Sequence, residues 1–122
     1  MSDSVGNDDK GVIYKVVSAQ EWSVAKEQGE FRGAAIDLTD GYIHFSTAEQ
    51  LRETVKKHFA GQTDLLLVGV EVDRLGDELK WEPSRGGALF PHLYAPLSID
   101  SVVMTQDMPV GEDGKHIIPI TC

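Results

Sequence analysis

The chain has 122 residues, a size typical of one domain with its own hydrophobic core. Its apolar content of 41% and charged content of 25% are typical of a globular protein, and no apolar run is long enough for a transmembrane helix. The formal net charge of −9 disfavours general nucleic-acid binding, whose affinity comes mostly from Lys and Arg. A small anionic ligand remains compatible with this charge, because one local pocket can oppose the overall field.

The ends of the sequence and its cysteine content favour a cytoplasmic protein. Residues 1–10 are mostly Ser, Asp, Asn and Gly, so we predict a disordered tail, and they lack the apolar stretch of a signal peptide. The sole cysteine, Cys122, fits a reducing compartment. The four histidines are scattered, and no CxxC or HExxH spacing occurs, so we expect no metal. Residues 11–122 are predicted to form a single domain.

Strand and helix signals alternate along the first half of this domain. The β-branched residues after position 11 predict a strand, and Ser18 with Glu21 forms a capping box at the start of a helix that Gly29 ends. In chain order we predict a strand over 12–17, a helix over 19–28, a loop over 33–41, a strand over 42–46 and a helix from 47 to about 59.

The second half is predicted to be mostly strands. Its most apolar segment, 65–72, is typical of a central strand buried on both faces. The remaining predictions are a strand over 79–82, an irregular segment over 83–87, a strand over 97–104 and a hairpin strand over 115–120. This order favours an α+β fold, with two helices in the N-terminal half on a largely antiparallel or mixed sheet.

The first segment that indicates chemistry is 41–47. His44 and Tyr42 are expected on the same face of the strand, opposite its apolar residues. Ser46 and Thr47 stand where the strand meets a helix N-terminus, a place where free N–H groups and the helix dipole favour anions. The alternative interpretation is that the two hydroxyls only cap the helix and His44 fills a half-buried surface.

The second segment, 81–94, is dense in residue types that binding sites use. Arg85 offers a planar fork for phosphate or carboxylate, and Gly86 allows a ligand close to the backbone. His92 can act as acid, base or donor, with Glu82 as its partner. The aromatic residues that could stack on a flat ring are Trp81, Phe90 and Tyr94. The alternative is an Ω-loop with ordinary aromatic packing.

Three segments of the chain resemble the bacterial family called "domain of unknown function 952". They are the residues at 13–16, 41–51 and 81–94, and the resemblance runs from about Val12 to Met104. It implies a fold related to the ADP-ribosyltransferases, which bind NAD in the cleft of a split mixed sheet. In that superfamily a first-strand His or Arg holds a ribose, a second motif at a strand–helix junction lines the nicotinamide pocket, and a late Glu orients the nucleophile.

Placed on this sequence, the resemblance implies Lys15 for the first position, 42–47 for the second and 91–94 for the third. The second motif matches well. Lys15 and His92 depart from the pattern, which puts transfer of ADP-ribose to a protein side chain in question. The RNA 2′-phosphotransferase branch works with histidines and arginines instead, but its basic surface is missing here.

We therefore expect a cleft that binds a nucleotide-like or anionic small molecule, NAD or a related nucleotide being candidates, with transfer at a ribosyl or phosphoryl centre as the reaction class. His44, His92 and Glu82 are the predicted catalytic residues. The predicted ligand-binding residues are Lys15, Tyr42, Ser46, Thr47, Trp81, Arg85, Gly86, Phe90 and Tyr94. The alternatives are a ligand sensor without turnover and a partner-binding domain.

Overall fold

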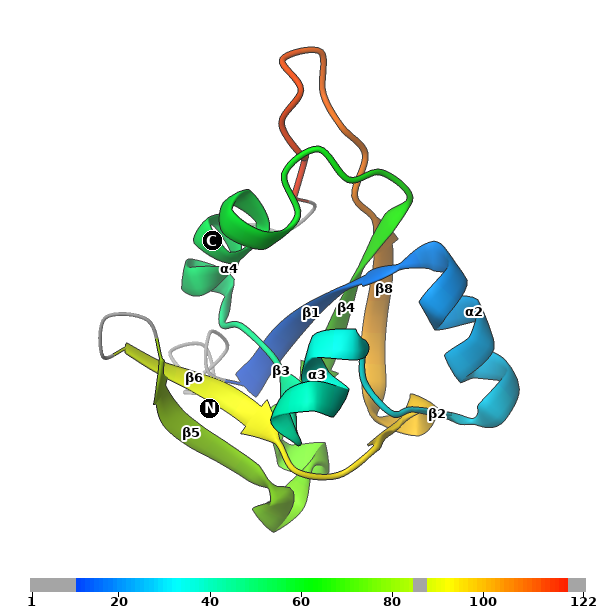
Figure 1. The fold of residues 1–122 in the computed structure, drawn as a ribbon. Coiled ribbons are helices and arrows are strands. Elements are labelled where there is room, and N and C mark those ends of the chain that lie inside the picture. The colour runs from blue at the N-terminus through cyan, green and yellow to red at the C-terminus, as the bar shows by residue number, and fades with distance from the viewer. Residues whose placement is uncertain (1–10, 85–87, 119–122) are drawn as a thin grey trace, which may run out of the picture.

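The computed structural model describes residues 11–84 and 88–118 and confirms an α+β fold (Figure 1). Within this part of the chain, three α-helices accompany three small antiparallel sheets. The predicted tail over 1–10 lies outside the described residues.

The largest sheet has the strand order β1-β4-β8. Its strands are β1 (Val12–Ser18), β4 (Leu65–Glu71) and β8 (Val102–Asp107), and both pairings are antiparallel. Strand β4 lies in the centre and is buried along most of its length, as its apolar sequence predicts. Gly69 marks a register shift against β8, where a Cβ atom would lie 2.6 Å from the side chain of Met104.

The second sheet has the order β3-β6-β5, with β3 (Ile43–His44), β6 (Ala88–Leu93) and β5 (Leu79–Ser84). A third, two-stranded sheet pairs β2 (Glu30–Phe31) with β7 (Leu97–Ser98). The first two sheets meet at an isolated bridge between Tyr14 and Ser46, where two backbone hydrogen bonds of 2.7 and 2.8 Å join them. The two larger sheets are thus separate from each other in the described chain except at this bridge.

The two longer helices begin where the sequence predicts. Helix α2 (Ala19–Gln28) is capped by Ser18 and Glu21, and Gly29 ends it with a positive φ of 83°. Helix α4 (Ala48–His58) is capped by Thr47 and Gln50, and it buries Leu51 and Val55. Short 3₁₀ segments cover Val72–Arg74, Gly76–Glu78 and Ile99–Ser101.

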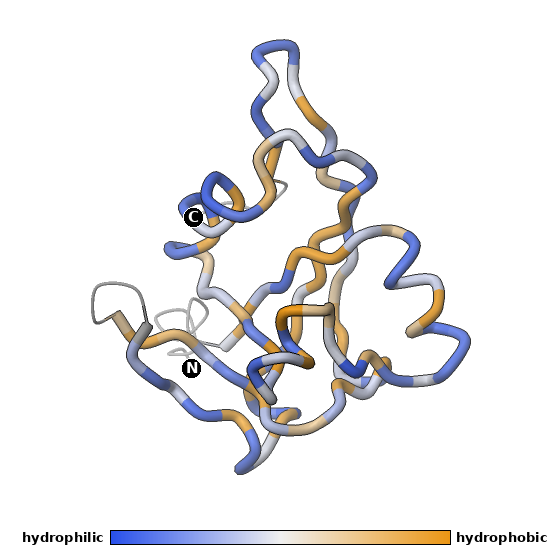
Figure 2. Tube along the Cα trace, in the orientation of Figure 1, coloured by the Kyte–Doolittle hydropathy of each residue, from blue (hydrophilic) through white to orange (hydrophobic). Residues whose placement is uncertain are grey.

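The buried apolar side chains form two clusters. One lies where β1, β4 and β6 pack with α2, and includes Ile13, Trp22 and Leu93. The other lies between α4 and the first sheet, and includes Leu51 and Leu67. Figure 2 shows hydrophobic residues along the central strands and hydrophilic residues on the outer sides of α2 and α4.

The loop predicted over 33–41 is wrong, because helix α3 (Ala35–Asp40) lies there. It lacks a polar N-cap, and Asp37 instead accepts a hydrogen bond of 2.8 Å from the backbone N–H of Ala34. The prediction of two helices therefore becomes three in the described chain, all before residue 60. The sheets are also antiparallel throughout the described pairs, with no parallel pair that would make them mixed.

Three strand predictions also change. The irregular segment predicted over 83–87 is wrong at Pro83 and Ser84, because β5 continues through Ser84 and pairs with β6, and residues 85–87 lie outside the described residues. An edge strand tolerates Pro83. The strand over 97–104 is interrupted by a 3₁₀ turn, so β7 and β8 belong to different sheets. The strand over 115–120 is reduced, in its described part, to one bridge between Val110 and His116.

Candidate functional site

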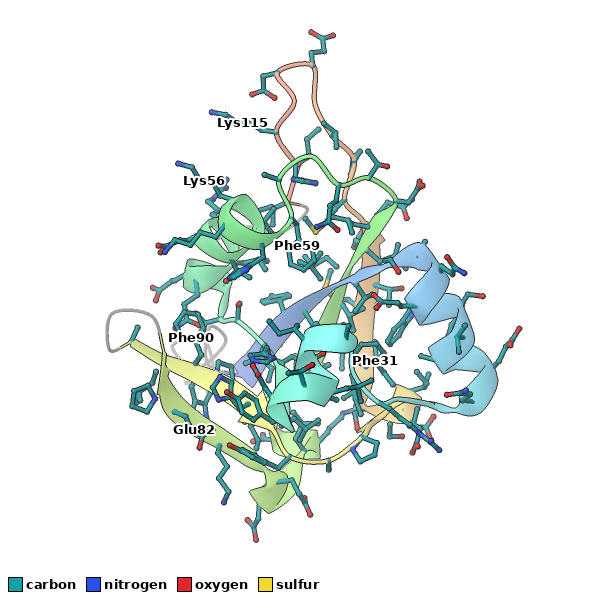
Figure 3. All side chains as sticks on the ribbon, in the orientation of Figure 1. Phe31, Lys56, Phe59, Glu82, Phe90 and Lys115 are labelled. Atoms are coloured by element: carbon teal, nitrogen blue, oxygen red, sulfur yellow. The ribbon has the colours of Figure 1, made fainter. Side chains whose placement is uncertain are left out.

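A cavity of 530 Å³ opens between α4, α3, β1 and β6. This volume lies in the range of small-molecule sites. Phe59, which follows α4, and Phe90, on β6, lie on its two sides, and Glu82 lies on the neighbouring strand β5 (Figure 3). The polar residues that line the cavity include Tyr14, Lys15, Glu21, His44, Ser46, Thr54, His58, Gln62 and His92.

Asp37 is the centre of a buried polar cluster behind the cavity. Its side chain is 1% exposed. Oδ1 lies 2.6 Å from Nδ1 of His44 and accepts the His44 backbone N–H at 3.1 Å, while Oδ2 lies 3.0 Å from Nζ of Lys15. One carboxylate therefore fixes residues from β1, α3 and β3 relative to one another.

These contacts determine the ionisation of Asp37. Burial acts to raise the pKa of its carboxyl group, but the His44 hydrogen bond, the Lys15 charge and the N–H donors of Ala34 and His44 outweigh it. Together they lower the pKa of Asp37 to about 2. Asp37 is thus an anion at neutral pH, able only to accept hydrogen bonds.

Lys15 is buried on β1. Its Nζ contacts both oxygens of Asp37, at 3.0 and 3.3 Å, and donates to the backbone oxygen of His44 at 2.9 Å. Burial lowers the pKa of Lys15, although the Asp37 carboxylate acts in the opposite direction. Its hydrogen-bonding capacity is directed to the protein, so Lys15 orders the wall of the cavity.

A second polar cluster surrounds His92 on β6. Nδ1 of His92 lies 2.8 Å from Oε1 of Glu82, and the Tyr94 hydroxyl donates to the same oxygen at 2.8 Å. The hydrogen bonds from His92 and Tyr94 lower the pKa of Glu82, and the bond to Glu82 raises the pKa of Tyr94 to about 12. The His92 side chain is 4% exposed, so this pair holds a buried imidazole in one orientation.

The ring of Tyr42 joins the two clusters. It stacks on His92 with centroids 4.2 Å apart and lies 4.7 Å from the ring of His44 and 5.1 Å from that of Tyr94. The two imidazole centroids are 5.4 Å apart. Burial, followed by the charges of Asp40 and Glu82, raises the pKa of Tyr42, so it stays neutral in this aromatic group.

The cavity brings together five of the predicted site residues, which are Lys15, His44, Ser46, Phe90 and His92. The hydroxyl of Ser46 lies 2.9 Å from that of Thr54 on α4. Tyr42, Glu82 and Tyr94 do not line the cavity. Tyr42 stacks on His92, Glu82 accepts from Nδ1 of His92, and Tyr94 donates to Glu82. Arg85 and Gly86 lie outside the described residues.

Two predicted ligand-binding residues have other positions. The Thr47 hydroxyl accepts the backbone N–H of Gln50 at 3.2 Å, which is the capping alternative. Trp81 pairs with Pro91 and Glu82 with Phe90, so Trp81 lies on the opposite face of the hairpin from Phe90 and His92. Trp81 is therefore not placed to stack on a ligand in this cavity.

Sequence reasoning did not find Asp37, which lies in the segment predicted as a loop over 33–41. Its role depends on contacts across the fold, with Lys15 and His44. A local signal exists nevertheless. Gly33 has a positive φ of 121°, and a Cβ atom there would lie 2.8 Å from that of Asp37, so the glycine leaves room for this carboxylate.

Two further properties concern metals and membranes. In the described ranges, no three His, Cys, Asp or Glu side chains are grouped as metal ligands would be. None of the helices in the described part of the chain is long and apolar enough to cross a membrane.

Comparison with known proteins identifies close relatives. Residues 16–105 match the family described as "Protein of unknown function (DUF952)". The crystal structure of protein CC0527 from Caulobacter crescentus is 51% identical, with a TM-score of 0.84, and the alignment covers 87% of this chain and 93% of that one. The solution structure of CC0527 is 52% identical, with a TM-score of 0.76 and coverages of 84% and 89%. No curated protein matches the chain.

Proposed function

The chain belongs to the DUF952 family, and we propose that its cavity binds a nucleotide-like or other anionic small molecule whose reaction is assisted by His44 and His92. One observation carries the proposal: these two histidines, from separate strands, each hold a carboxylate partner and line the same 530 Å³ cavity. Imidazoles oriented by carboxylates are suited to proton transfer near neutral pH.

The lining of the cavity supports this ligand class. Apolar and aromatic side chains such as Leu51, Phe59 and Phe90 can contact a flat ring. The histidines at the other wall can donate to phosphate or hydroxyl oxygens. A ligand with a flat ring and a polar, anionic end matches this division.

The arrangement also supports an ADP-ribosyltransferase-like fold, which we propose as the finer description. The three positions implied by the family resemblance contribute Lys15, His44 with Ser46, and His92 to one cavity. The β-structure is divided into two sheets that meet beside this cavity at Tyr14 and Ser46. Fold likeness alone does not assign a reaction, so ADP-ribosyl and phosphoryl transfer both remain candidate reactions.

A ligand sensor without turnover is the second candidate. The observation that favours it is the position of Glu82, which contacts Nδ1 of His92 and does not line the cavity. The third motif position has His92 instead of a carboxylate, and Glu82 does not replace that carboxylate in the cavity. Binding would use the same cavity in this case, and only the product analysis below differs.

Thermal-shift measurements with NAD, ADP-ribose, cyclic nucleotides and inorganic phosphate test the proposal. A ligand of the native state raises the melting temperature by mass action. We expect a shift in the wild type that is lost in His92→Gln and kept in His116→Gln, a matched change outside the cavity. Arg85→Ala tests the sequence-based prediction for Arg85 in the same way.

The absence of a shift with all of these compounds would contradict the proposed ligand class. If one compound binds, its conversion can be followed by NMR over hours. New product signals that disappear in His92→Gln support an enzyme, whereas an unchanged ligand supports the sensor.

A further inference from the structure

The hydrogen-bond partners of the two histidines define which ring nitrogen carries hydrogen. Nδ1 of His92 faces a Glu82 oxygen at 2.8 Å, and Nδ1 of His44 faces an Asp37 oxygen at 2.6 Å. Ionised carboxylates accept hydrogen bonds and donate none. In both residues Nδ1 is therefore the donor. The two histidines differ in the surroundings of their other ring nitrogen, Nε2.

Nε2 of His92 is open to the cavity. Among the described residues it has no hydrogen-bond partner, yet every buried side-chain nitrogen or oxygen of this part of the chain has one. Nε2 is therefore not a fully buried atom. Nδ1 is held by Glu82 and His92 lines the cavity, so Nε2 is the ring nitrogen left for a ligand. A neutral His92 thus presents a lone pair to a bound ligand.

Nε2 of His44 has a different environment. It lies 2.9 Å from Oδ2 of Asp40, a carboxylate whose side chain is 39% exposed. This contact is attractive only when Nε2 carries hydrogen, because a lone pair there would face a negative oxygen. Asp37, Asp40 and the aromatic ring of Tyr42 surround the imidazole, and the Lys15 ammonium contacts its backbone oxygen.

We infer that the two histidines have opposite roles. His92 removes a proton through Nε2. The Nε2–H group of His44 donates a hydrogen bond to Asp40 in the free protein and to an oxygen of the ligand in the complex. This inference rests on the proposed function and adds the chemistry of that site. The substrate class is a molecule with a hydroxyl group, or an attacking water, beside an oxygen anion.

The proton transfer balances within the site. The O–H bond of the hydroxyl or water breaks, its proton forms an N–H bond at Nε2 of His92, and the electron pair stays on the attacking oxygen. The resulting imidazolium is compensated by Glu82 at 2.8 Å. The attacking oxygen uses this electron pair to form a bond to the ribosyl or phosphoryl centre. The bond from that centre to the leaving oxygen breaks, and its electron pair stays on the leaving oxygen. His92 returns the proton to that oxygen, so the protein ends unchanged. Glu82 acts through His92 and is a positioning residue.

Nitrogen-15 NMR of the histidine side chains in the ligand-free protein tests the assignment directly. When its ring is neutral, we expect His92 to carry hydrogen on Nδ1 and to have a bare Nε2, and we expect hydrogen at Nε2 of His44. A neutral His92 ring with hydrogen on Nε2 would overturn the assignment, as would a bare Nε2 on His44.

Two variants connect these signals to their partners. Glu82→Gln should shift the His92 population toward hydrogen on Nε2, and Glu82→Asp should restore at least part of the wild-type pattern. Glu27→Gln, an exposed change on α2 away from the cavity, is the matched control and should change nothing. An unchanged His92 tautomer in a folded Glu82→Gln protein would contradict the positioning role.

Inorganic phosphate is the probe for the second half of the inference. Added phosphate should move the His44 Nε2 signal, and Asp40→Asn should lower the phosphate concentration needed, because it removes the competing carboxylate. A His44 signal that stays constant up to high phosphate concentration contradicts the exchange with Asp40. The tautomer measurements use no ligand, so they can fail while the proposed ligand class holds, and the reverse is also possible.

Discussion

Asp37 organises the candidate site at the scale of one residue. It binds Lys15, the side chain and backbone of His44, and the first turn of α3. A buried ion pair is costly to break from one side, because the remaining charge has no partner. The carboxylate therefore stabilises the fold and orients the histidine through the same contacts.

Asp37→Asn is expected to lower the free energy of unfolding by about 3 kcal/mol at neutral pH, because Lys15 loses its buried partner. Asp40→Asn is the matched control. Its carboxylate is partly exposed, so the expected loss is about 0.5 kcal/mol or less. Denaturant unfolding measures both. Equal losses in the two variants would show that burial of the Asp37 pair is unimportant.

The lowered pKa of Asp37 also predicts a dependence of stability on pH. The folded value of about 2 lies below the model value of 3.8, so the folded protein holds this proton less tightly than the unfolded chain. The contribution, about 2 kcal/mol, is fully present above pH 4 and is lost as the pH falls toward 2. The difference between wild type and Asp37→Asn should shrink over this window, and a constant difference would contradict the assignment.

At the scale of elements, caps explain which helices the sequence predicts. The capping box of Ser18 and Glu21 is local, so the bounds of α2 follow from a few neighbouring residues. Helix α3 has Ala34 at its N-cap, and its carboxylate Asp37 is held by Lys15 from another strand. That contact is distant in sequence, and no local pattern indicates it.

The hairpin of β5 and β6 was missed for a related reason. Pro83 and Pro91 interrupt the usual strand pattern, but the register opposes them to Leu89 and Trp81, and β5 is an edge strand. The aromatic density of this segment predicted a site, and Phe90 and His92 do line the cavity. Which face each side chain occupies depends on that register, and so the placement of Trp81 could not be predicted.

Thr47→Ala separates capping from ligand binding. We expect it to lower the free energy of unfolding by about 1 kcal/mol, because the Thr47 hydroxyl caps α4, and to leave ligand affinity unchanged. Thr105→Ala, on the exposed side of β8, is a control expected to have little effect on either. Thermal denaturation with and without ligand gives both quantities. A large loss of affinity in Thr47→Ala would favour the anion-site interpretation.

At the scale of the whole molecule, the cavity separates α4 from much of the domain. Val55 of α4 packs in the cluster of the first sheet, whereas Leu51, Thr54 and His58 line the cavity. Regions with fewer packed neighbours open more readily than a central strand. The domain is therefore expected to contain regions of different local stability.

Native-state hydrogen exchange tests this expectation. The amides of α4 should exchange through a local opening that requires less free energy than the opening of β4, which is central and buried. Comparison of exchange at several low denaturant concentrations distinguishes local from global opening. Equal opening free energies for α4 and β4 would show that the two belong to one cooperative unit.

The junction of the two sheets has a consequence for ligand size. Direct strand pairing between these sheets consists, in the described chain, of the two hydrogen bonds of Tyr14 with Ser46. Phe59 packs against the first sheet and His92 belongs to the second. A molecule that contacts both residues therefore spans the junction between the two sheets. Such a molecule would contact both sheets and hold them together, whereas a short anion would contact only one of them. Length, and not charge alone, would then set how strongly a compound stiffens the protein.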